Sequence, residues 1–213
     1  TWSSAVPIHY SGMSPTTTFR VWGQIQVTPS GQLVAMAYAG RDNWCLVSTD
    51  RGRTWQAHLI VRTPPETDYN EMAVAIISDT DWIAIARGAT RREGGSSMRQ
   101  FVTRNGGLRW KDLGSTNAEW SGGYVSPAMQ TVRCGGELMI VWAYMARGSR
   151  STPPPTPNSL IVRYATADGA LSSSRVWSPQ QIVGQVGSFT HRSGYPSIAL
   201  ANDCSHGVMV AGR

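Results

Sequence analysis

The chain has 213 residues, of which 41% are hydrophobic and 15% charged, and its formal net charge at pH 7 is +6. This length and apolar content predict one domain with its own core, and no run reaches the roughly 20 apolar residues of a membrane span. The positive charge comes almost wholly from arginine, because Lys111 is the single lysine. The arginines are scattered among loops, which argues against nucleic-acid binding and suits the two-bond recognition of planar carboxylates.

Paired runs of alternating apolar and polar residues predict hairpins along the whole chain. Turn-forming Gly, Pro, Asn, Asp and Ser residues stand at the bends between the paired runs, and no amphipathic helix is predicted. The four pairs are 21–27 with 33–38, 72–77 with 82–86, 128–132 with 138–142, and 197–200 with 207–211.

A short phrase recurs between these hairpins, from Ser48 to Trp55, from Thr103 to Trp110 and, stretched, from Thr166 to Trp177. Each copy predicts a strand end, a tight turn and a tryptophan. Asp or Asn in the phrase can bond the backbone ahead of it, and Gly supplies the positive φ of the turn. An extended segment follows each tryptophan, at 56–61, 111–115 and 178–183, and the N-terminal segment 2–8 reads as a fourth copy.

The tryptophans at 2, 55, 110 and 177 recur at spacings of 53, 55 and 67 residues. Each repeat therefore holds about four strands, which is typical of a propeller blade. We predict an all-β β-propeller of four-stranded antiparallel blades over residues 1–213, with the tight turns at the outer edge and the tryptophans packed between blades. About three full blades and partial blades at both ends form an incomplete ring, and a four-bladed ring is the alternative.

Three cysteines, Cys45, Cys134 and Cys204, fall in predicted strands or at bends. They cannot all pair, and they lack the spacing of metal ligands. We therefore expect buried free thiols, with no metal site and no cofactor.

The first phrase matches Ser-x-Asp-x-Gly-x-Thr-Trp, the Asp-box, at every defined position, and the chain resembles the sialidase (neuraminidase) superfamily of Asp-box, or BNR-repeat, β-propellers. Phe19-Arg20-Val21-Trp22 is similar to the family's Phe-Arg-Ile-Pro, although Trp22 replaces the proline. The resemblance implies that Arg20 is the first of three arginines that hold the sialic acid carboxylate. Asp42, eight residues before Asp50, stands where the family has its acid/base aspartate.

The resemblance extends to the later blades. Glu71 and Arg87 match the glutamate that supports the nucleophile and the second arginine of the triad, and Gly194-Tyr195-Pro196-Ser197 resembles the segment with the tyrosine nucleophile. The third arginine is expected on the loop after residue 142, where Arg147 and Arg150 both stand. Only 29 positions separate Asp42 from Glu71, where the family usually has further blades.

The resemblance implies an exo-α-sialidase-like glycoside hydrolase whose partners are sialylated or other acidic glycans, located outside the cell or on a larger assembly. A tyrosine nucleophile suits this substrate, because the sugar's own carboxylate repels a carboxylate nucleophile. The alternative is a non-catalytic glycan-binding or structural propeller module, such as an adhesin or a virion or tail receptor-binding component. In that case Glu71 and Arg87 form a strand-end ion pair, Asp42 is a turn residue and Tyr195 is an inter-blade aromatic residue.

Overall fold

The computed structural model describes residues 7–14, 18–40, 42–62, 67–90, 96–116, 124–146, 158–186, 194–201 and 204–212. The predicted all-β fold is confirmed. The elements are β1 (His9–Ser11), β2 (Arg20–Val27), β3 (Leu33–Ala39), β4 (Asp42–Ser48), β5 (Thr54–Val61), β6 (Thr67–Ile76), β7 (Asp81–Thr90), β8 (Ser96–Arg104), β9 (Lys111–Ser115), β10 (Tyr124–Cys134), β11 (Glu137–Ala146), β12 (Asn158–Thr166), α1 (Ala167–Ser172), β13 (Gln181–Val186), β14 (Gly194–Leu200) and β15 (Gly207–Gly212).

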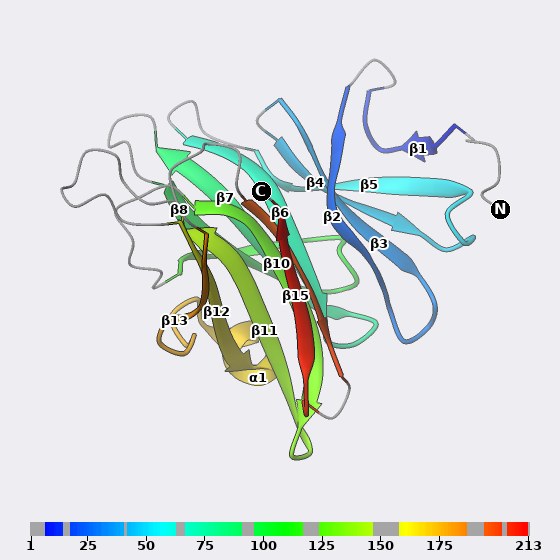
Figure 1. Ribbon diagram of the computed structural model, residues 1–213. Helices are drawn as coiled ribbons and strands as arrows, with labels where there is room; N and C mark the ends of the chain where they lie inside the picture. The colour runs from blue at the N-terminus through cyan, green and yellow to red at the C-terminus, as the bar shows by residue number, and fades with distance from the viewer. Residues whose placement is uncertain are drawn as a thin grey trace, which may run out of the picture.

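The strands form three antiparallel units of four, β2–β5, β6–β9 and β10–β13, and a hairpin of β14 with β15. Among the described residues no sheet closes on itself. Strands β2, β6, β10 and β14, the first of each unit, contact one another in chain order. Figure 1 shows the β2–β5 sheet on one side of the molecule and the remaining sheets on the other. The arrangement is that of a partial propeller in an open array.

Apolar side chains fill the spaces between successive sheets. Met36 and Cys45 of the first sheet pack with Met72 and Trp82 of the second. A second cluster joins Ile83 and Ile85 to residues of the third sheet, Trp142 and Tyr144 among them. Met209 of β15 packs against Met145 and Leu160. Strands buried on both faces need apolar residues at successive positions, as 82–86 of β7 show with 0% exposure.

A strand that the sequence analysis did not predict, β1, extends the first sheet at its outer edge, beside β5. Strand β1 runs parallel to β5, with His9 opposite Thr54 and Tyr10 opposite Trp55. Tyr10 packs edge-on against Phe19 at a centroid distance of 4.8 Å, and both contact the cluster that contains Trp55. Trp55 therefore packs against the N-terminal segment and not between blades as predicted. Trp2, at the start of the predicted fourth copy, lies outside the described residues.

The tight turns of the first two phrases have the same geometry. Backbone N–H groups four residues ahead donate to Asp50 Oδ1 (from Thr54, 2.9 Å) and to Asn105 Oδ1 (from Arg109, 2.9 Å). Each tryptophan ring then donates from Nε1 to the carbonyl of the glycine three residues before it, at 3.1 Å in Trp55 and 3.0 Å in Trp110. These turns join the third and fourth strands, at the outer side of each sheet.

The Asp50 carboxylate is expected to contribute to the stability of the fold in a pH-dependent way. The uncharged variant Asp50→Asn tests this contribution. Hydrogen bonds from Thr54 lower the pKa of the Asp50 carboxyl from 3.8 to about 2. A depressed folded-state pKa contributes stability above the ordinary value, and this contribution is lost as the pH falls toward 2. We expect Asp50→Asn, which keeps the Oδ1 acceptor that Asn105 uses, to melt below wild type near pH 7. Thermal melts should show this difference shrinking below about pH 4, and a constant difference would contradict the assignment.

The third phrase does not form the predicted turn. Trp177 follows Thr166 by 11 positions, against 7 in the other copies, and the extra length is taken up by the short helix α1. Thr166 caps this helix by accepting a hydrogen bond from the Gly169 N–H at 3.1 Å. Trp177 is buried between the second and third sheets, where its Nε1 donates to Gln100 Oε1 at 2.8 Å. Its predicted inter-blade packing is confirmed, whereas the expectation of no helix is wrong.

Two of the three cysteines form a disulfide, which corrects the expectation of free thiols. Cys134 ends β10 and Cys204 lies between β14 and β15, with their Cα atoms 5.4 Å apart. The bond thus joins corresponding hairpin bends of neighbouring units. Cys45 is a buried free thiol as expected, and burial raises its pKa.

Candidate functional site

One edge of the array gathers the starts of the first strands and the ends of the second strands, because the two run antiparallel in every unit. Across units, Asn43 Nδ2 donates to the Asn70 carbonyl at 2.6 Å. Trp22 and Tyr195 meet at a centroid distance of 5.1 Å. The hairpin bends meet at the opposite edge, for example through Cys134–Cys204. We call the first edge the upper rim.

Each of the four first strands is irregular near this rim. The register shifts between Trp22 and Gln26 in β2, between Tyr69 and Met72 in β6, between Val125 and Ala128 in β10, and between Gly194 and Pro196 in β14. Bulges bend a strand and re-aim its side chains, and they are frequent beside active sites. Glu71 and Tyr195, both predicted as site residues, lie inside two of these shifts. The alternation of apolar and polar residues in the sequence does not reveal these register shifts.

Glu71 and Arg87 are brought together at the rim. Arg87 Nη1 lies 2.9 Å from Glu71 Oε2, and the two side chains are 20% and 7% exposed. The Asn70 side chain accepts a hydrogen bond from the Glu71 N–H at 2.7 Å, which fixes the bulge that carries the glutamate. Arg87 Nε is buried without a hydrogen-bond partner among the described residues. The pair is therefore a largely desolvated ion pair between β6 and β7.

Arg20 begins a chain of aromatic contacts that ends at Tyr195. Its Nη1 lies 3.5 Å from the Tyr38 hydroxyl, a hydrogen bond that raises the pKa of the exposed guanidinium. The ring centroids of Tyr38 and Trp22 are 6.3 Å apart, and the Trp22 ring in turn packs edge-on against Tyr195. The structure thus connects the first predicted arginine and the predicted nucleophile through two rings, although the residues come from the first and last units.

Tyr195 has a strained backbone. Its φ is +68°, a left-handed conformation that a bulky residue rarely adopts and that a residue before proline normally avoids. Such strain costs of order 1–3 kcal/mol, and strained residues cluster at functional sites. The side chain is 47% exposed. The ring is therefore held at the rim by its surroundings and remains accessible there.

Asp42 opens β4 and lies 3.6 Å from Arg62 Nε through its Oδ2. Its neighbour Asn43 is completely buried and makes the inter-unit bond to Asn70. The sequence analysis did not single out Asn43 or Asn70, and it predicted no strand over residue 43, which the structure places in β4. Through this bond the start of β4 is tied to the bulge that holds Glu71.

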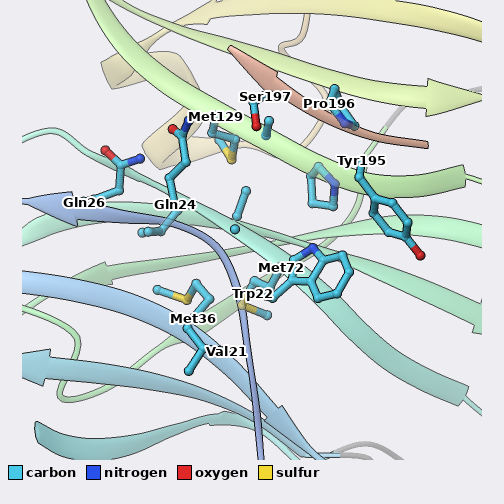
Figure 2. Close-up of a pocket in the computed structure, with 15 residues that line it drawn as sticks. Val21, Trp22, Gln24, Gln26, Met36, Met72, Met129, Tyr195, Pro196 and Ser197 are labelled. Atoms are coloured by element: carbon cyan, nitrogen blue, oxygen red, sulfur yellow. The ribbon is translucent and has the colours of Figure 1, made fainter. Parts of the chain in front are cut away.

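A cavity of about 340 Å³ lies between the first strands. Its walls include Trp22, Met36, Met72, Met129 and Tyr195, and Figure 2 shows the Trp22 and Tyr195 rings next to each other at one end, with Gln24 and Gln26 at the other. No charged side chain lines it among the described residues. Tyr195 is thus the one predicted site residue in its wall, and the charged candidates lie apart from it.

Two predicted residues, Arg147 and Arg150, lie outside the described residues, so the third arginine has no position here. Within the described ranges no group of three His, Cys, Asp or Glu side chains could hold a metal ion. Among the same residues no helix has the length and hydropathy needed to cross a membrane.

Neither a family model nor a curated protein matches the sequence. Solved structures match the fold. A protein of unknown function from Dyadobacter fermentans superposes with a TM-score of 0.59 at 18% identity, over 89% of this chain and 48% of that one. NanB sialidase from Streptococcus pneumoniae superposes with a TM-score of 0.58 at 16% identity, over 81% of this chain and 24% of that one. The α-L-arabinofuranosidase Arb93a from Fusarium graminearum superposes with a TM-score of 0.61 at 12% identity, over 87% of this chain and 55% of that one.

This chain spans about half or less of the solved proteins it matches. Two of these are glycoside hydrolases with different substrates in their names, so the similarity supports a glycosidase-like fold and leaves the sugar open.

Proposed function

We propose that the protein acts on glycans that carry an acidic sugar, as a sialidase-like glycoside hydrolase. The observation that supports this proposal is that four predicted residues, Arg20, Glu71, Arg87 and Tyr195, all lie on first or second strands toward the same edge of the array, the bulged rim. Arginine side chains at the rim supply the two-bond donors that a carboxylate prefers. The Asp-box phrases and the glycosidase-like fold support the same class of function.

In this mechanism Tyr195 is the nucleophile, Glu71 accepts its proton, and Asp42 protonates the leaving oxygen. Arg20 and Arg87 hold the substrate carboxylate, with Arg147 or Arg150 as the third arginine. The ordinary pKa of tyrosine is near 10, so attack near neutrality needs the base and the positive field of the arginines.

A second candidate is a glycan-binding module without hydrolysis. The ion pair of Glu71 with Arg87 at 2.9 Å favours it, because it engages both groups with each other. The exposed Tyr195 ring and the partly buried Trp22 ring then serve as a stacking surface for a sugar beside Arg20.

Arg20→Lys tests the anionic-sugar site in either case. Lysine keeps the charge but loses the planar fork that binds a carboxylate in two bonds. Titration with a sialyl oligosaccharide should show an affinity at least about tenfold weaker than wild type. Arg133→Lys, at the opposite hairpin edge, is the matched control and should bind as wild type does. Equal affinity of Arg20→Lys and wild type would refute the assignment of Arg20.

A fluorogenic sialoside separates the two candidates. Release of the fluorophore by wild type supports the hydrolase. Saturable binding of the sialyl oligosaccharide without release selects the binding module, and absence of both refutes the acidic-sugar proposal.

A further inference from the structure

The cavity between the first strands differs in chemistry from the charged rim above it. Three methionines, Met36 of β3, Met72 of β6 and Met129 of β10, line it from three different units and are at most 2% exposed. Methionine is flexible and polarisable, and its sulfur packs favourably on aromatic rings. The walls can therefore adapt to a flat apolar group.

The polar groups of the cavity are uncharged. Gln24 and Gln26 of β2 and Ser197 of β14 contribute amides and a hydroxyl, and Figure 2 shows the two glutamines away from the Trp22 and Tyr195 rings. A carboxylate in such surroundings would lose its hydration without gaining a cation, which is costly. The cavity therefore disfavours the acidic sugar proposed for the rim.

The cavity is large enough for a small molecule, and irregular strands form part of its wall. Its 340 Å³ falls within the range of about 300–1,000 Å³ typical of small-molecule sites. Residues in the register shifts of β2, β10 and β14, namely Gly23, Gln24, Pro127 and Tyr195, contribute to its wall. Three irregular strands and the strained Tyr195 thus shape this space.

We propose that this cavity is a binding site for an uncharged aromatic group, which lies between the methionines and against Trp22. The cavity shares Trp22 and Tyr195 with the acidic-sugar proposal, but binding of an uncharged aromatic group needs none of the charged residues of that proposal. The glutamine amides and Ser197 would select ligands with an uncharged hydrogen-bonding substituent.

The test is titration with N-phenyl-1-naphthylamine, an uncharged aromatic amine whose fluorescence rises in apolar surroundings. Wild type should bind it saturably with one site per chain. Ser197→Trp places a large ring at the cavity wall and should weaken binding at least tenfold. Ala199→Trp is the matched control, because Ala199 is exposed two residues further along β14 and does not line the cavity; it should bind as wild type does.

Trp22→Ala is a second variant that removes the aromatic wall, and it decides the question if Ser197→Trp does not fold. It should also weaken probe binding at least tenfold. No saturable binding to wild type, or wild-type affinity in both Ser197→Trp and Trp22→Ala, would overturn the proposal. Equal loss in Ala199→Trp would place the probe along the exposed face of β14 beyond the cavity and would overturn it as well.

Discussion

Tyr195→Phe is expected to abolish hydrolysis of a sialoside while leaving sugar binding within about twofold of wild type. The substitution removes only the hydroxyl, which is the attacking atom in the proposed mechanism. The ring contact with Trp22 at 5.1 Å and the backbone at φ +68° do not need the hydroxyl. The measurement is turnover of a fluorogenic sialoside beside a binding titration with a sialyl oligosaccharide.

The control for this prediction is Tyr164→Phe, which removes the hydroxyl of another exposed tyrosine, on β12. It should keep wild-type turnover. Retained hydrolysis in Tyr195→Phe would exclude tyrosine as the nucleophile. Loss of binding together with hydrolysis would instead make the hydroxyl a ligand for the sugar.

The sequence predicted the features that depend on local chemistry. The Asp50 and Asn105 turns are set by a side-chain acceptor that bonds a backbone N–H four residues on, and by a glycine. Both can be recognised in a short stretch of sequence. The strand pairs likewise follow from alternation within a few residues, and each predicted pair matches an observed one, although the predicted strand 72–77 runs one residue past the end of β6.

The features that the sequence did not predict depend on contacts across the array. The meeting of Trp22 with Tyr195 joins residues of the first and last units. The register shifts at Glu71 and Tyr195 lie where the first strands bend at the rim. Cys134 bonds to Cys204 because corresponding hairpin bends of neighbouring units meet. None of these has a signature in the spacing of residues along the chain.

The candidate site was predictable only in part, for a related reason. Repeat position places Glu71 and Arg87 on paired strands, so their contact follows from antiparallel pairing, although both strands extend past them to Thr67 and Thr90. Repeat position does not say whether such a pair serves catalysis or only joins two strands. Asn43, which ties β4 to the same bulge, was missed because a single buried amide resembles a turn residue in sequence.

Glu71→Gln and Arg87→Met are each expected to lower the free energy of unfolding by about 3 kcal/mol, because each removes one of the two opposite charges of a desolvated ion pair. The salt bridge is 2.9 Å long and its glutamate side chain is 7% exposed. Replacing both residues removes both charges, so the double variant should lose less than the sum of the single variants. Urea unfolding of the four proteins measures this coupling.

The matched control is Arg104→Met, which breaks a pair with Asp81 at 3.3 Å in which the arginine is 61% exposed. Solvent screens such a pair, so the expected loss is below about 1 kcal/mol. If the losses at Glu71 and Arg87 simply add, the two charges do not stabilise each other. A strong coupling together with full hydrolysis of a sialoside by Arg87→Met would make the pair a strand-end contact and would remove Arg87 from the substrate site.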